Sequence, residues 1–113
     1  MNLEFLQLSM KVSKINEYGN KNTRYFVLTN KRILLLNKSS NILVNLAIRR
    51  NVPLSFLIAI TVSSRSFEFI LHFKNDYDDD DLRLQTESRS RLIEFMVKSF
   101  ATEFQKALTS YQV

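Results

Sequence analysis

The chain has 113 residues, of which 45% are hydrophobic, so it can bury a core without disulfide or metal staples. It contains no cysteine, which excludes disulfides, thiolate metal sites and cysteine nucleophiles. No apolar run reaches the length that spans a bilayer. The first residues do not form a basic segment followed by a long apolar stretch, so we do not expect a signal peptide. We therefore expect one domain over residues 1–113, in a soluble cytoplasmic protein.

Short β-type runs fill residues 9–86, separated by turns rich in Asn, Asp and Ser. The predicted strands cover residues 9–16, 23–29, 32–36, 42–48, 57–63, 67–73 and 82–85. Gly19 lies in the first turn, and Pro53 is expected to interrupt strand pairing. In the sixth run, Phe67, Phe69, Leu71 and Phe73 alternate with more polar residues, which is typical of a half-buried antiparallel strand.

From Ser88 the spacing of apolar residues changes to steps of three and four, which predicts an amphipathic helix over 88–110 with Ser88 as N-cap. The apolar positions are Leu92, Ile93, Met96, Val97, Phe100, Phe104, Ala107, Leu108 and Tyr111. Seven strands followed by one helix predict a mainly β fold with one C-terminal helix. The fold class expected is a pleckstrin-homology-like seven-stranded bent sheet or barrel, capped by an α-helix.

The net charge of +5 is uneven along the chain. Residues 1–50 carry nine lysines and arginines against two glutamates, whereas residues 51–113 carry more acids than bases. A basic half beside an acidic half is consistent with an anionic partner for the basic half, and equally with an ordinary basic protein.

Residues 14–29, Lys-Ile-Asn-Glu-Tyr-Gly-Asn-Lys-Asn-Thr-Arg-Tyr-Phe-Val-Leu-Thr, resemble the start of the tail homology 1 domain of class I myosins. Residues 51–64 resemble a second block of that family, and the similarity extends over about residues 10–105. The resemblance implies a module from the tail of a single-headed actin motor, which binds anionic lipids, phosphoinositides in particular, and attaches the motor to membrane.

The resemblance also implies a headgroup site between the first two strands, formed by Lys14, Lys21 and Arg24. Lysine meets a phosphate as a point charge, and arginine can engage it with two parallel hydrogen bonds. Asn22 stands where the family often has a second basic residue, which favours diffuse attraction over recognition of one headgroup. Further basic residues that could add to such a face are Lys11, Lys31, Arg32, Lys38, Arg49 and Arg50.

Other functional sites find less support in the sequence. His72 is the only histidine and is expected to be a satisfied polar residue on a strand. The acidic run Asp76–Asp81 lacks the glycine of a calcium loop and is interpreted as a solvated hairpin loop. A single glycine excludes Gly-rich phosphate loops, and we predict no enzyme, no cofactor and no metal. Arg24 and Tyr25 place a cation beside an aromatic, but no RNA-binding signature appears, so nucleic acid is not an expected partner.

The sequence therefore predicts a membrane-targeting module that binds anionic phospholipids or phosphoinositides, peripheral at the membrane or cell cortex. The alternative is a protein-interaction (adaptor) module of the same fold with no lipid specificity. A lipid-binding module responds to vesicles in a salt-sensitive way, whereas an adaptor ignores vesicles and retains a protein partner.

Overall fold

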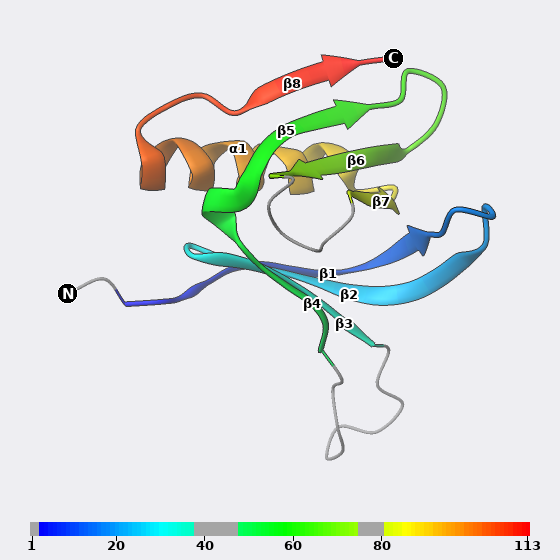
Figure 1. Cartoon of the computed structure of the whole chain (residues 1–113), viewed down its shortest axis with the longest axis horizontal. Helices are drawn as coiled ribbons and strands as arrows, with labels where there is room; N and C mark the ends of the chain where they lie inside the picture. Colours follow the sequence, from blue (N-terminus) through cyan, green and yellow to red (C-terminus); the bar gives the residue numbers. More distant parts are fainter. Residues whose placement is uncertain (1–2, 38–47, 75–80) are drawn as a thin grey trace.

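The computed structural model describes residues 3–37, 48–74 and 81–113, and in these it has eight strands, a short 3-10 helix and one α-helix (Figure 1). All eight strands belong to one sheet, in the order β4-β3-β2-β1-β7-β6-β5-β8. The elements are β1 (Leu6–Ile15), β2 (Lys21–Thr29), β3 (Arg32–Asn37), β4 (Ile48–Pro53), η1 (Leu54–Phe56), β5 (Leu57–Val62), β6 (Glu68–Phe73), β7 (Leu82–Gln85), α1 (Arg89–Phe104) and β8 (Thr109–Gln112).

The sheet bends sharply between β1 and β7. These two strands share only the pairs Ser13 with Gln85 and Lys14 with Leu84. On either side of this narrow joint the antiparallel pairing is longer, so β1–β4 form one half of the sheet and β5–β8 the other (Figure 1). The two halves face each other across the core, and α1 covers their open side. This confirms the predicted mainly β fold with a C-terminal helix.

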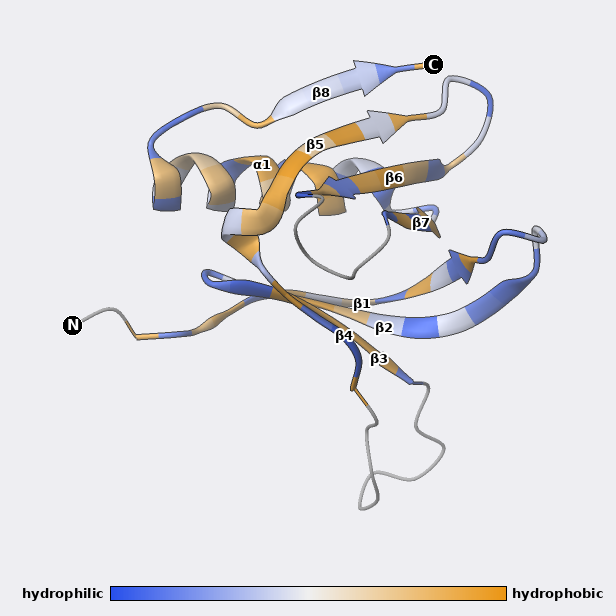
Figure 2. Ribbon diagram, viewed as in Figure 1, coloured by the Kyte–Doolittle hydropathy of each residue, from blue (hydrophilic) through white to orange (hydrophobic). Residues whose placement is uncertain are grey.

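Period-two alternation places the core residues on the inner faces of both halves. Phe69, Leu71 and Phe73 of β6 are buried, as expected from the sequence. Phe26 and Leu28 of β2 are completely buried on the opposite half. Along its length, β2 changes from hydrophilic residues near the β1–β2 turn to hydrophobic residues towards its other end (Figure 2). Full burial of such a side chain stabilises the fold by about 1.5–3 kcal/mol relative to exposure.

Three strand predictions need correction or fall outside the described residues. Phe67 does not join the inner face, because β6 begins one residue later and leaves Phe67 51% exposed. Pro53 does not interrupt pairing: it ends β4 opposite Arg32, and β4 is an edge strand, where a missing N–H is tolerated. Of the strand predicted over 42–48, only Ile48 is described, and it begins β4.

The helix is shorter than the predicted 88–110. It ends at Phe104, and the next residue, Gln105, adopts the left-handed conformation with φ of 54°. The Gln105 N–H donates to the carbonyl of Ala101 at 2.8 Å, which closes the last turn. Ser88 is the N-cap residue, as predicted, although its side chain makes no capping hydrogen bond. No helix among the described residues is long and apolar enough to cross a membrane.

An eighth strand follows the helix, where seven strands were expected. β8 pairs in parallel with residues 59–62 of β5, and all four of its side chains are exposed. Leu108, just before β8, is buried. The apolar spacing therefore continued beyond the helix because Leu108 reaches the core from an extended segment.

Candidate functional site

The β1–β2 hairpin brings Lys14 and Arg24 to one face of the sheet. In the register of this pair, Lys14 lies opposite Asn22 and Arg24 lies opposite Val12. Directly opposed residues share a face, and Val12 is buried in the core, so this is the inner face. Diagonal neighbours of this kind lie about 7–8 Å apart, within reach of two long side chains. These two residues of the predicted headgroup site therefore come together.

Lys21 lies on the other face of the same hairpin. It is paired with Ile15, one residue out of phase with the Lys14 pair, and successive side chains of a strand point to opposite faces. Its side chain is exposed. The structure thus does not bring Lys21 onto the face that holds Lys14 and Arg24.

β4 adds two arginines near the same end of the inner face. Arg50 is paired with the buried Leu35, and its guanidinium carbon lies 5.9 Å from the centre of the Phe73 ring. A register shift between Leu35 and Leu36 leaves Arg49 as an extra residue in β4. The Nε of Arg49 donates to Asn37 Oδ1 at 2.7 Å.

Asn37 is itself paired with Arg24, which links Arg49 to the hairpin. We call Lys14, Arg24, Arg49 and Arg50 the inner-face cationic cluster. The sequence prediction counted Arg49 and Arg50 only as outer contacts, because their place depends on the register of β4, which the predicted strand over 42–48 did not include.

Arg24 is poorly compensated in this arrangement. Its Nη1 donates to the Thr23 carbonyl at 2.8 Å, but its buried Nε has no hydrogen-bond partner among the described residues. Burial, and after it the nearby charge of Arg49, lower the pKa of Arg24. Both effects disfavour the protonated guanidinium in the free domain. An anion placed between Arg24 and Arg49 would offset the repulsion between the two cations and supply an acceptor for the Nε of Arg24.

A hollow of about 640 Å³ opens beside the cluster, which is within the usual size range of small-molecule sites. It is lined by Lys14, Ile15, Asn16, Glu17, Arg50, Asp81 and Arg83. Arg83 Nε donates to Glu68 at 2.7 Å, and Asp81 is bonded to His72 at 2.6 Å. Glu17 is the acid of the β1–β2 turn. The lining of the hollow therefore contains both acidic and basic side chains. Two of its basic residues, Lys14 and Arg50, belong to the inner-face cationic cluster.

Three of the outer cations predicted from the sequence lie elsewhere. Lys31 is in the β2–β3 turn and Arg32 begins β3, at the far end of the nine-residue β2, about 25–30 Å from Lys21. Arg32 forms an ion pair with Glu4 at 2.7 Å. Lys11 is exposed in the middle of β1, on the outer face. Lys38 lies outside the described residues. Lys11, Lys31 and Arg32 do not extend the cationic cluster.

His72 is a satisfied polar residue on β6, as predicted. Its Nε2 lies 2.7 Å from the Thr61 hydroxyl and its Nδ1 lies 2.6 Å from Asp81. This order of hydroxyl, imidazole and carboxylate also occurs in hydrolases. Here Thr61 lies in mid-strand, with β6 on one side and β8 on the other. Since the neighbouring N–H groups take part in strand pairing, we interpret the chain of contacts as structural support for the start of β7.

The acidic run Asp76–Asp81, which follows β6, was considered as a calcium-binding loop and predicted to be a solvated hairpin loop. Residues 76–80 lie outside the described residues, so a solvated loop there stays a prediction. Within the described ranges no group of acids and histidines could hold a metal ion.

The sequence of the chain matches one family model, described as "Unconventional myosin tail, actin- and lipid-binding", over residues 3–111. No curated protein sequence matches it significantly.

Solved structures resemble it at low sequence identity. The crystal structure of the DH/PH domains of p115-RhoGEF aligns with a TM-score of 0.69 and 11% identity, over 88% of this chain but only 31% of that one. The hSac2 domain from human phosphoinositide phosphatase Sac2 aligns with 0.72 and 8%, over 97% of this chain and 77% of that one. The Slm1-PH domain in complex with D-myo-inositol-4-phosphate aligns with 0.63 and 16%, over 84% and 92%. At these identities the likeness shows a pleckstrin-homology-like fold.

Proposed function

The chain belongs to the unconventional myosin tail family, and on this premise we propose that it is a membrane-targeting module that binds anionic phospholipid headgroups through its inner-face cationic cluster. The family is described as actin- and lipid-binding, and the Slm1 domain of the same fold was solved with an inositol phosphate. We further propose that residues 1–113 act as one domain, peripheral at a membrane or the cell cortex on its cytoplasmic side.

The observation that carries this proposal is the state of Arg24. A buried donor that finds no acceptor in the described part of the chain, beside a second arginine, costs stability in the free domain. Such a cost is expected where a ligand supplies the missing acceptor, because strain and unpaired groups concentrate at functional sites. A phosphate oxygen is an acceptor with the right charge, and guanidinium groups bind it with charge-assisted hydrogen bonds.

The number and spread of the cations bear on the kind of lipid. Lys14, Arg24 and the two arginines of β4 come from three different strands. Several cations that converge from different strands favour a headgroup with more than one phosphate over a single phosphodiester. We therefore propose phosphoinositides as the preferred ligands and phosphatidylserine as a weaker one.

Vesicle sedimentation tests the proposal. Phosphatidylcholine vesicles would contain either a phosphoinositide or phosphatidylserine at equal total charge, at low and at high salt. The variant Lys14→Glu/Arg24→Glu should bind at least about 30-fold more weakly, since each basic residue near an anionic surface contributes about 1 kcal/mol. Binding by the unchanged chain should fall with salt because the attraction is screened.

The matched control is Lys11→Glu/Lys31→Glu, which makes the same change of charge away from the cluster. It should lose much less affinity. An equal loss in both variants would mean diffuse attraction rather than a site, and absence of binding by the unchanged chain at low salt would contradict the proposal.

A protein-interaction module is the second candidate, and a separate observation favours it. Leu3, Phe5 and Leu6 are 68%, 56% and 62% exposed, beside a hollow of about 580 Å³ between the start of β1 and α1. An adaptor would leave vesicles unbound and lose its protein partner on Phe5→Ser. Vesicle binding that survives Phe5→Ser would place the function at the cationic cluster instead.

A further inference from the structure

The segment that follows α1 lacks the residues that normally end a helix. Residues 105–113 contain no glycine and no proline, and the apolar spacing of α1 continues through Leu108 and Tyr111. The helix nevertheless ends, because Gln105 has a φ of 54°, the one positive φ at a non-glycine residue of the described chain. This conformation is unfavourable for a residue with a Cβ. Contacts made further along the segment, rather than its local sequence, therefore hold this turn.

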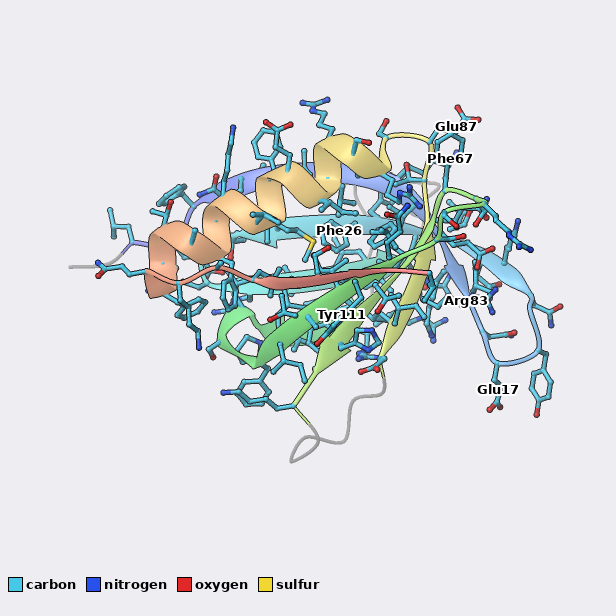
Figure 3. All side chains as sticks on the ribbon, turned by 90° about the horizontal axis from the view of Figure 1, so that it is seen from above. Glu17, Phe26, Phe67, Arg83, Glu87 and Tyr111 are labelled. Atoms are coloured by element: carbon cyan, nitrogen blue, oxygen red, sulfur yellow. The ribbon has the colours of Figure 1, made fainter. Side chains whose placement is uncertain are left out.

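β8 is fixed to the sheet mainly through its backbone. It pairs in parallel with residues 59–62 of β5, and the backbone of Val113 continues this pairing. Leu108, ahead of the strand, is the one buried side chain of residues 105–113. Figures 1 and 3 show β8 alongside β5 at the edge of the sheet, with Tyr111 on it. Backbone pairing has little sequence preference, so another extended segment with one suitable apolar residue fits the same edge.

β8 covers only part of the edge of β5. β5 begins at Leu57, whereas its pairing with β8 begins at Ala59, because the chain must first turn back from α1. A hollow of about 390 Å³ lies at this turn. Its lining includes Phe104, Lys74 and Ile58, which is 49% exposed, and no acidic residue is among the described residues that line it. An extended segment that is not tethered to α1 can continue beside Ile58 and fill this hollow.

We propose that the edge of β5 is a docking site for an extended peptide of a partner protein, and that β8 is its exchangeable cover. The peptide places an apolar residue where Leu108 lies and, before it, an apolar and an acidic residue that meet Ile58 and Lys74. The displaced segment continues α1, as its apolar spacing favours, and Gln105 leaves the left-handed conformation. The site shares no residue with the inner-face cationic cluster, so the inference stands without the proposed lipid binding.

Fluorescence anisotropy with two labelled peptides tests the site on the full chain. The self peptide has the sequence of residues 105–113, and the second peptide has Glu-Leu in place of its first two residues, Gln-Lys. The unchanged chain should bind the self peptide weakly, because its own β8 competes at a high effective concentration. The variant Leu108→Ser should bind it at least about tenfold more tightly, since β8 has lost its buried anchor, and should bind the Glu-Leu peptide about tenfold more tightly still. The matched variant Tyr111→Ser, which changes an exposed side chain of β8, should bind the self peptide like the unchanged chain.

A second variant tests the cover without weakening the core. Gln105→Gly removes the conformational cost of the turn, so amide hydrogen exchange in β8 should slow about fivefold, with β6 unchanged. Unchanged exchange in β8 would overturn the exchangeable cover.

Three results would overturn the docking site. The first is equal affinity of Leu108→Ser and the unchanged chain for the self peptide, with the same far-ultraviolet circular dichroism. The second is a set of peptide-induced amide shifts at residues 3–6 instead of residues 59–62. The third is a dimer of the unchanged chain in sedimentation equilibrium, which would make a second copy of the chain the occupant.

Discussion

Replacing Arg24 by methionine should make the free domain more stable and the lipid-binding domain weaker. Methionine keeps an unbranched apolar stem of similar length. It removes the charge that is close to Arg49 and the buried Nε, which has no acceptor within residues 3–37, 48–74 and 81–113. Most core or near-core substitutions destabilise a protein, so a gain at this position is a specific expectation.

The magnitude follows from the environment of the side chain. A buried donor without an acceptor costs about 1–3 kcal/mol, and partial solvation of this guanidinium reduces that figure to about 0.5–1 kcal/mol. For a domain of this size the melting temperature should rise by about 2–4 °C. Vesicle affinity should fall about tenfold or more, since a charge-assisted hydrogen bond to phosphate contributes about 1.5–3 kcal/mol.

Thermal denaturation and vesicle sedimentation on the same samples measure both effects. Arg83→Met is the matched control, because Arg83 is an arginine near the same hollow with a carboxylate partner, Glu68, at 2.7 Å. Its replacement should lower the melting temperature. If Arg24→Met melts lower than the unchanged chain and still binds vesicles with full affinity, the reasoning about Arg24 is wrong.

Three further predictions concern the fold. The hydrogen bond from Thr29, and after it Arg32, hold the pKa of Glu4 below its ordinary value of 4.5, against the opposing effect of desolvation. The stabilisation by Glu4 is therefore present above pH 4.5 and is lost as the pH falls through the lowered pKa. The difference in melting temperature between the unchanged chain and Glu4→Gln should shrink as the pH is lowered below 4.5, and a difference that stays constant would contradict this. Arg89→Met should cost about 2 kcal/mol in urea denaturation, because Nη1 of Arg89 donates to three carbonyls around the β5–β6 connection at 2.7–2.9 Å; a loss below about 0.5 kcal/mol would refute that role. Leu108→Ala should speed amide hydrogen exchange in β8 and leave β6 protected, and unchanged β8 protection would show that backbone pairing alone holds this strand.

Much of the fold could be predicted from local patterns. Alternation identified Phe69, Leu71 and Phe73 as core residues, and three- and four-residue spacing identified the start of the helix. The errors arose where tertiary structure decides the outcome. Nothing local distinguishes Phe67 from the buried phenylalanines that follow it. The parallel pairing of β8 with β5 joins segments about 50 residues apart, which no short-range signal records.

The candidate site was partly accessible from the sequence. Residues 14 and 24 flank one turn, so their approach could be expected from the hairpin itself. The face of each side chain depends on the register. Lys21 pairs with Ile15, one position beyond the Lys14–Asn22 pair, and it therefore lies on the opposite face. Arg50 reaches the cluster through the pairing of β4 with β3, and Arg49 through a bulge in that pairing. Both features depend on contacts between strands.

The most direct test of the account is a titration of the labelled chain with a soluble inositol polyphosphate, followed residue by residue through its amide NMR signals. The account predicts saturable shifts that are largest at Lys14, Arg24 and Arg50, with the signals of Lys31 and Arg32 at the other end of β2 unchanged. Shifts centred on Lys31 and Arg32, or no saturable shift at Arg24, would contradict it.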